Sequence, residues 1–167
     1  MYTIEAADWE DVKVLWTQWR TYDLNNRTPQ TLATIDRVWV NPDDLLKFKQ
    51  GKTFVFLSDG VPLGCLKLID FSSFHPRLRV VGIGNVAVDH SIRGSGVGKH
   101  LMRVADLYIR VMGYDVAMLY QSEYSKLSQF YENLGYRTHE KIMLRYYGDT
   151  ILSNKELNEV VKKIGKF

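Results

Sequence analysis

The sequence predicts a single domain of mixed α/β fold, in which a central, mostly antiparallel sheet is flanked by helices. Three observations carry this expectation. Short apolar segments follow one another at the spacing of hairpin strands. Two of the gaps between them hold amphipathic helical patterns instead of turns. The chain has 167 residues, of which 46% are hydrophobic and 25% charged, and this length suffices for one sizeable core.

The N-terminal part is predicted to be mainly helical. Tyr2–Ala6 alternates like a short strand, and Asp8 then caps a helix with a tryptophan-rich apolar stripe. Polar residues and a proline predict a loop over Thr21–Arg37, with room for a broken helix. A further helix is expected over Asn41–Phe48, because an N-cap asparagine is followed there by a proline.

Three strands are predicted in the middle of the chain. Lys52–Leu57 and Pro62–Phe71 flank a Ser-Asp-Gly turn of hairpin type. Leu78–Val88 follows as the third strand, and Gly82 and Gly84 within it indicate a bulge or a close approach by another backbone.

The C-terminal third alternates strands and helices. Asp115–Gln121 reads as a strand, Ser125–Leu134 as a helix that Gly135 ends, and Lys141–Tyr147 as a final strand. A last helix follows a capping box. We expect this helix to dock on its own domain and not to form a dimer contact. The capping box consists of Ser153 and Glu156. The apolar face of the helix consists of Leu157, Val160, Val161 and Ile164.

Composition excludes several classes of protein. No apolar run approaches the length of a membrane helix, and the first residues lack the pattern of a signal peptide, so we expect a cytoplasmic protein that binds no membrane. A net charge of +3 spread along the chain does not indicate nucleic-acid binding, but it suits an anionic cofactor. The single cysteine, Cys65, is expected to be a buried core thiol.

The stretch Asn85–Met102 combines a buried strand end, a glycine-rich turn and the start of an amphipathic helix. The unpaired N–H groups at a helix N-terminus, together with the helix dipole, make such a junction a site for phosphate. A P-loop is excluded, because Arg93 stands where its first glycine belongs and His100 follows its lysine. A dinucleotide fingerprint at Gly82 and Gly84 is unfavourable, because there the glycines precede an apolar run instead of opening a helix.

The third pattern, [QR]-x-x-G-x-[GA], is satisfied by Arg93, Gly96 and Gly98. A second segment, Phe130–Tyr136, reads F-Y-x-x-x-G-Y about thirty residues later. With these two motifs, in this order and spacing over roughly Phe54–Tyr146, the chain resembles the GNAT superfamily of acyl-CoA-dependent N-acyltransferases.

This resemblance implies an enzyme that transfers the acetyl group of acetyl-CoA to a primary amine of a small molecule, peptide or protein. The amine attacks the thioester directly and passes through a tetrahedral intermediate, and no metal is needed. Residues 1–50 would form the acceptor side, residues 52–147 the cofactor-binding core and residues 149–167 an added helix. By the same resemblance, main-chain groups and two cations would hold the cofactor: Val86, Ala87, Val88, Arg93, Gly94, Ser95, Gly96, Val97, Gly98 and Lys99.

Two positions are implied to carry or replace catalytic groups. Tyr131 matches the place where the family often keeps the acid that protonates the departing thiolate. Tyr124 stands where an asparagine often binds the cofactor, and its bulk would alter the path of the cofactor arm. An N–H near Val86 would stabilise the oxyanion.

The general base is the open question, because the strand before the glycine turn carries no carboxylate. Glu123 ranks first, and Asp70 and His75 are the other candidates. On the acceptor side Tyr22, Asp23 and Trp39 are possible contacts, although solvated loop residues are the commoner case.

Three alternatives remain at this point. A GNAT-like domain can hold acyl-CoA without turnover, as a sensor or an assembly piece. An enzyme of this kind can also use a longer acyl donor or a hydroxyl acceptor. Either a monomer or a homodimer is compatible with the sequence.

Overall fold

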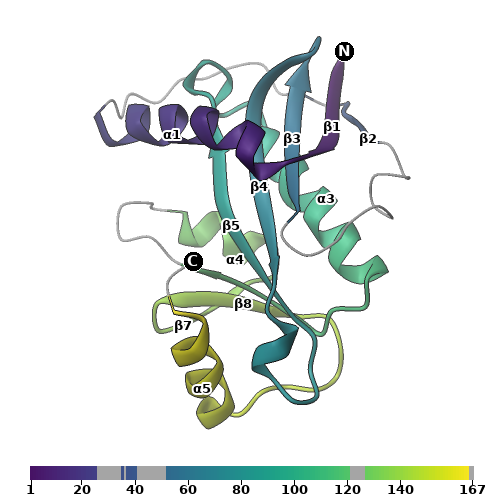
Figure 1. Cartoon of the computed structure of the whole chain (residues 1–167), viewed down its shortest axis with the longest axis vertical. Helices are drawn as coiled ribbons and strands as arrows, with labels where there is room; N and C mark the ends of the chain where they lie inside the picture. The colour runs from purple at the N-terminus through teal and green to yellow at the C-terminus, as the bar shows by residue number, and fades with distance from the viewer. Residues whose placement is uncertain (26–34, 36, 41–51, 121–126, 166–167) are drawn as a thin grey trace. The chain divides into compact units, whose positions relative to one another are not determined.

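The computed structural model describes residues 1–25, 35, 37–40, 52–120 and 127–165 (Figure 1). Its strands hydrogen-bond in the order β2-β1-β3-β4-β5-β6-β8-β7, and most neighbouring pairs are antiparallel, as predicted. The strands are β1 (Tyr2–Ala7), β2 (Trp39–Val40), β3 (Thr53–Ser58), β4 (Val61–Asp70), β5 (Val80–Val88), β6 (Val116–Tyr120), β7 (Arg137–His139) and β8 (Ile142–Tyr146). The helices are α1 (Trp9–Asn25), α3 (Val97–Val111), α4 (Ser128–Asn133) and α5 (Asn154–Ile164), with 3-10 turns η1 (Ser72–Phe74) and η2 (His90–Ile92).

The chain divides into two compact units, which are described separately. The first unit comprises Met1–Leu68 and Asn85–Tyr108, and the second comprises Ile69–Gly84 and Ile109–Phe167. The prediction of a single domain stays a prediction.

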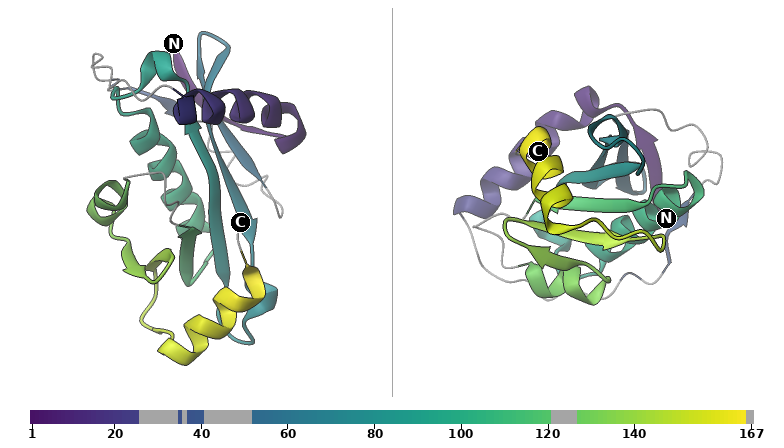
Figure 2. Two further views of the ribbon diagram at one scale, coloured as in Figure 1. Left: turned by 90° about the vertical axis from the view of Figure 1, so that its left-hand side faces the viewer. Right: turned by 90° about the horizontal axis from the view of Figure 1, so that it is seen from below.

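In the first unit, α1 and α3 cover opposite faces of the strands (Figure 2). Successive side chains of a strand point to opposite faces, which explains the arrangement. Val55 and Cys65 pack with Val12 and Trp19 of α1. Their neighbours on the other face meet α3, where the ring of Phe54 contacts that of Tyr108 edge-on at 6.1 Å.

The second unit buries its core between strands and the C-terminal helix. Val116 and Met118 of β6 alternate toward this core, and Leu157 and Val160 of α5 pack against the same cluster. The helix begins with the predicted capping box, in which the Ser153 hydroxyl accepts from the Glu156 N–H. Figure 2 shows α5 and α4 on opposite sides of the strands of this unit. The last helix thus packs on the strands of its own unit, as expected, and the expectation that it forms no dimer contact stays a prediction.

The β3–β4 hairpin shows how local sequence fixes a turn. Asp59 and Gly60 have φ values of 46° and 82°. Two consecutive positive φ values give the type I′ turn that suits the twist of a hairpin, and Asp-Gly is a favoured pair for it. The predicted hairpin turn is confirmed.

Several boundaries differ from the prediction. Helix α1 continues to Asn25, whereas a loop was expected from Thr21. The hydroxyl of Thr17 donates to the Lys13 carbonyl and that of Thr21 to the Thr17 carbonyl, so both threonines bond back along the helix and are accommodated in it. The short strands β2 and β7 were not predicted, because two or three residues carry no periodicity. The helix expected over Asn41–Phe48 lies outside the described residues.

Candidate active site

The glycine turn has the backbone that the motif requires. Gly94 and Gly96 have φ values of 78° and 92°, a region that residues with a Cβ rarely adopt. Helix α3 begins directly after the turn, at Val97. Its first N–H groups have no acceptor one turn earlier within the helix, so the amides of Val97, Gly98 and Lys99 are donors for an outside anion.

The turn is anchored from inside the first unit. The side chain of Ser95 is 1% exposed, and its hydroxyl donates to the Ile92 carbonyl. The Ser95 carbonyl accepts from the N–H of Ile35 over 2.7 Å. His100, one turn into α3, places its Nε2 2.6 Å from the Ile35 carbonyl oxygen, so this nitrogen is the donor. Ile35 is thus held through both of its main-chain groups.

The side chain of Arg93 folds back onto the end of β5. Its Nε and Nη2 both donate to the Val88 carbonyl, at 3.0 and 2.9 Å. This carbonyl is therefore engaged by the protein itself. The arginine fixes the strand end relative to the glycine turn.

Asp89 closes the junction between β5 and η2. Its Oδ1 accepts from the N–H and the hydroxyl of Ser91, at 2.9 and 2.6 Å, and its Oδ2 accepts from the indole Nε1 of Trp19. Partial burial raises the pKa of Asp89, but the hydrogen bonds from Ser91 and Trp19 and the charge of His90 outweigh it and hold the pKa below its usual value. The sequence analysis missed this residue, although Asp-x-Ser after a strand is a turn signal.

The residues of β5 that were assigned to the cofactor lie in the same unit. Ala87 is buried and packs on the α1 side with Cys65, whereas Val86 and Val88 are half-buried. Asn85, just before them, has a φ of 54°. The predicted irregularity of this strand thus lies one residue after Gly84. The β5–β6 pairing register covers Val80–Ile83, ahead of this point.

Tyr131 is buried in α4, where its ring contacts two aromatic neighbours. Phe130 and Tyr136 lie edge-on to it, with ring centres at 5.1 and 6.2 Å. Burial raises the pKa of Tyr131 to about 12. The phenol therefore keeps its proton throughout the pH range in which enzymes are assayed.

The structure leaves several predicted site residues undescribed, among them the first candidate for the base and most of the acceptor-side contacts. Glu123 and Tyr124 lie outside the described residues, as do the side chains of Tyr22 and Asp23. Trp39 lies in β2 and is 53% exposed.

Asp70 and His75 are both engaged in structural contacts of the second unit. Asp70 accepts from the Ser72 N–H at 2.9 Å. Partial burial raises the pKa of Asp70, but hydrogen bonds from Ser72 and Tyr114 and the charge of Arg79 lower it further than burial raises it.

His75 uses both ring nitrogens. Its Nδ1 accepts from the N–H groups of Arg77 and Leu78, at 3.1 and 2.9 Å. The proton therefore lies on Nε2, which is 3.0 Å from Glu156 Oε2 and donates to it. This pair connects η1 to α5 within the second unit.

The donor set of the turn fits the diphosphate of acetyl-CoA. The helix-start amides of α3 and the exposed Lys99 lie at the same turn, and the only carboxylate described beside it, Asp89, has its oxygens occupied by Ser91 and Trp19. Within the described part of the chain, no group of three or more His, Cys, Asp or Glu is placed to hold a metal ion. None of the described helices has the length and apolar character needed to span a bilayer.

A family model described as the acetyltransferase (GNAT) domain matches residues 49–138, which is more than half of the chain. No curated protein matches the sequence significantly. Among solved structures, the chain is similar to a GNAT-family acetyltransferase from Staphylococcus aureus Mu50, with 15% identity and a TM-score of 0.62 over 89% of this chain and 100% of that one. It is also similar to a GNAT-family acetyltransferase from Brucella melitensis in complex with acetyl-CoA, with 14% identity and a TM-score of 0.61 over 92% of each chain.

A GCN5-related N-acetyltransferase from Ralstonia eutropha JMP134 shares 16% identity and a TM-score of 0.59 over 90% of this chain and 99% of that one. At these identities the structural likeness establishes the fold. The match to the family model shows the family, and the two sequence motifs and the geometry of the glycine turn agree with it. The chain therefore belongs to the GNAT family of acyltransferases, whose domain binds acetyl-CoA.

Proposed function

We propose that the protein transfers the acetyl group of acetyl-CoA to a primary amine of a small molecule, peptide or protein. The observation that carries this proposal is the glycine turn, in which two positive φ values lead directly into a 15-residue helix at Val97. This geometry offers main-chain donors to a diphosphate. The amides of residues 94–99 and the ammonium of Lys99 would hold it, with Val86 and Ala87 offering main-chain groups to the amides of the cofactor arm.

The reaction forms one C–N bond and breaks one C–S bond. The neutral amine attacks the thioester carbonyl and gives a tetrahedral intermediate, whose oxyanion needs a nearby donor, for which we propose the N–H of Val86. Collapse of the intermediate expels the thiolate of CoA. We assign the proton that this thiolate gains to the phenol of Tyr131, which is protonated at neutral pH because burial raises its pKa to about 12.

The attacking amine must first lose a proton. At pH 7 an amine with a pKa near 10.4 is neutral only to the order of one part in a thousand. We propose Glu123 as the acceptor of this proton, directly or through water. The structural contacts of Asp70 and His75 favour this choice, because both of those side chains are already used within the second unit.

Thermal unfolding with acetyl-CoA, CoA, NADH and ATP in parallel tests the donor. At about one hundred times its dissociation constant a ligand adds about 2.7 kcal/mol of stability, and each kcal/mol raises the midpoint by about 2–4 °C for a chain of this size. We expect a rise of several degrees with both CoA forms. No rise with either form, beside a response to NADH, would refute the assignment of the turn.

A second candidate function is acyl-CoA binding without turnover. It is favoured by one observation: β5 carries no carboxylate along its length, Val80–Val88. Release of the CoA thiol in the presence of a panel of amines separates the two functions. The same assay with acyl donors of increasing length, and with alcohols beside amines, tests the choice of acetyl and amine.

The role of Tyr131 is tested by Tyr131→Phe. We expect turnover to fall about a hundredfold or more, the usual range for loss of a general acid, with unchanged affinity for CoA. Tyr136→Phe is the matched control, because it removes a hydroxyl from the same aromatic cluster. Equal turnover of the two variants would remove Tyr131 from the mechanism without affecting the assignment of the donor.

A further inference from the structure

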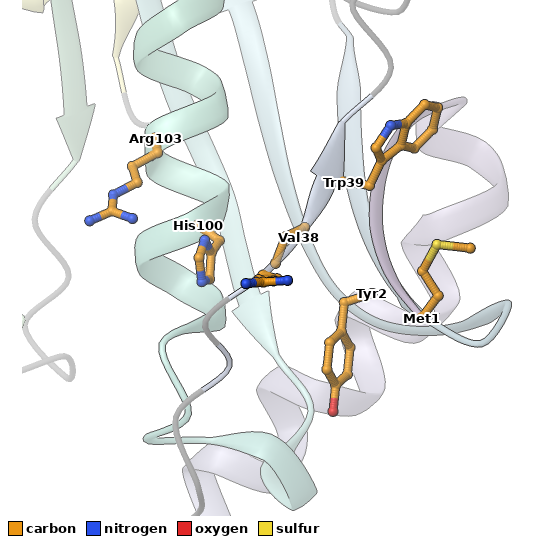
Figure 3. A pocket seen from close by; sticks show the side chains of 7 residues that line it. Met1, Tyr2, Val38, Trp39, His100 and Arg103 are labelled. Atoms are coloured by element: carbon orange, nitrogen blue, oxygen red, sulfur yellow. The ribbon is translucent and has the colours of Figure 1, made fainter.

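A cavity of about 740 Å³ lies in the first unit, between α3 and the strands β1 and β2. None of the residues to which we assign the acyl donor lines it. Figure 3 shows the side chains that surround it. They are Met1, Tyr2, Arg37, Val38, Trp39, His100 and Arg103.

The lining is polarised. His100 and Arg103, which come from neighbouring turns of α3, stand at one end of the group, with the Arg103 guanidinium directed away from the other side chains, and Trp39 and Met1 stand at the other end (Figure 3). Tyr2 lies between the two ends. A ligand that spans the cavity would therefore meet charge at one end and an apolar, aromatic surface at the other.

The described residues at the charged end are cationic. No carboxylate is among the described residues that line the cavity, and neither Arg37 nor Arg103 forms an ion pair with any residue in the described part of the chain. His100 donates from Nε2 to the Ile35 carbonyl, which fixes the plane of its ring. The N-terminal ammonium of Met1 is paired with Asp59. The described lining thus contributes two guanidinium groups that attract anions.

The apolar end is formed by an exposed indole. Trp39 is 53% exposed and Tyr2 is 38% exposed, so the two rings offer aromatic surface to a ligand instead of filling a core. Flat apolar groups pack well on such rings. The volume of the cavity lies within the range of small-molecule sites.

We propose that this cavity binds a small organic anion in which a carboxylate is joined to a flat apolar body. A guanidinium group presents two parallel N–H donors that match the two oxygens of a carboxylate, which favours this anion over a spherical one. The site is separate from that of the acyl donor. The proposal does not depend on the acyl-transfer function.

Naphthoate is a suitable probe, because it joins a carboxylate to a flat aromatic body, and naphthamide is its neutral match. Isothermal titration of the whole chain, saturated with CoA, measures both. We expect naphthoate to bind with one site per chain and naphthamide to bind at least about tenfold more weakly, since a hydrogen bond to a charged group contributes about that much.

The double variant Arg37→Gln/Arg103→Gln is expected to weaken naphthoate binding by about tenfold or more. Arg77→Gln/Arg137→Gln is the matched control, because both arginines are exposed, lie in the second unit and together carry the same charge. If the double variant does not fold, Trp39→Leu, which changes a half-exposed side chain, is expected to weaken naphthoate binding without changing the effect of acetyl-CoA on the melting temperature.

Three results would overturn the proposal. The first is equal binding of naphthoate and naphthamide, and the second is no binding of naphthoate at millimolar concentration. The third is binding of naphthoate to the chain without CoA but not to the chain saturated with CoA, which would make the cavity part of the donor site. A failure of the donor assignment would appear separately, as loss of the thermal response to both CoA forms while naphthoate still binds.

Discussion

The indole Nε1 of Trp19 lies 3.0 Å from Oδ2 of Asp89 and donates a hydrogen bond to it across 70 residues of sequence. The other oxygen of the same carboxylate caps η2 through Ser91. One side chain thus connects α1 to the turn that leads into the glycine motif. The orientation of the motif therefore depends in part on α1.

We expect Asp89→Asn to lower both stability and donor affinity. Ser91 and Trp19 bond to different oxygens of Asp89, and an asparagine replaces one of them with an NH₂ donor, so a donor is left without a partner at a cost of about 1–3 kcal/mol. Thermal unfolding and titration with CoA measure the two effects. Trp19→Phe, which spares the carboxylate, is expected to lose stability with a smaller loss of CoA affinity. Equal CoA affinity of Asp89→Asn and the unaltered protein would contradict this role.

The carboxyl group of Asp89 also makes the stability of the protein depend on pH in the acid range. Because the pKa of Asp89 is lower in the folded chain than in the unfolded one, its contribution is complete above the unfolded value and is lost as pH falls through the folded value. The pKa of Asp70 is lowered in the same direction. We therefore expect the free energy of unfolding to fall below about pH 4. In Asp89→Asn this fall should be smaller. Urea titrations at several pH values measure the free energy of unfolding, and the same dependence on pH in the variant and the unaltered protein would argue against the linkage.

Gly64→Ala is expected to destabilise the protein and weaken donor binding. A Cβ at Gly64 would lie 3.3 Å from the Ala87 carbonyl oxygen, 3.3 Å from Val97 Cγ1 and 3.5 Å from Leu101 Cδ1. The neighbours would have to shift at the first turn of α3, at a cost of about 1–3 kcal/mol for overpacking. Gly148→Ala is the control, because the nearest atom to its Cβ would be an Asp115 oxygen at 3.7 Å. Similar melting temperatures of the two variants would contradict the prediction.

Cys65 is expected to be inert in the native protein. Burial raises the pKa of Cys65 to about 12, and an N–H of Ala87 opposes this only in part. At pH 8 the thiolate is therefore scarce as well as covered. A thiol reagent should find no group in the folded chain and one per chain in guanidinium. If this holds, assays of CoA release through its thiol have no background from the protein. Rapid labelling of the folded chain would disprove it.

The elements most visible in the sequence were those specified locally. The glycine turn, the hairpin at Asp59 and the capping box at Ser153 each depend on the conformational preference of one or two residues, and the structure has all three. The strands of the sheet follow from alternation, and their boundaries moved by one or two residues. Helix α1 was underestimated because threonines that discourage a helix in general bond back to its carbonyls here.

Contacts between distant side chains were not accessible to the same reasoning. Asp89 and Trp19, or His100 and Ile35, carry no pattern that would pair them across 70 or 65 residues. The candidate acid Tyr131 was found because its motif is local, and its pKa follows from burial that only the fold reveals. The proposed base, Glu123, was chosen by elimination and stays a prediction.

The attachment of Ile35 limits how the segment before it, which we propose to lie on the acceptor side, can be exchanged. The Ser95 carbonyl and the His100 ring hold this residue through its N–H and C=O, which every amino acid except proline possesses in full. A chimaera that takes residues 26–34 from another family member leaves this junction intact. A graft that extends through position 35 needs no particular side chain there for these two bonds. It must keep the main chain of position 35 within reach of the Ser95 carbonyl and the His100 ring, so His100 has to be retained. Chimaeras that test the proposed acceptor side are therefore best joined just before Ile35.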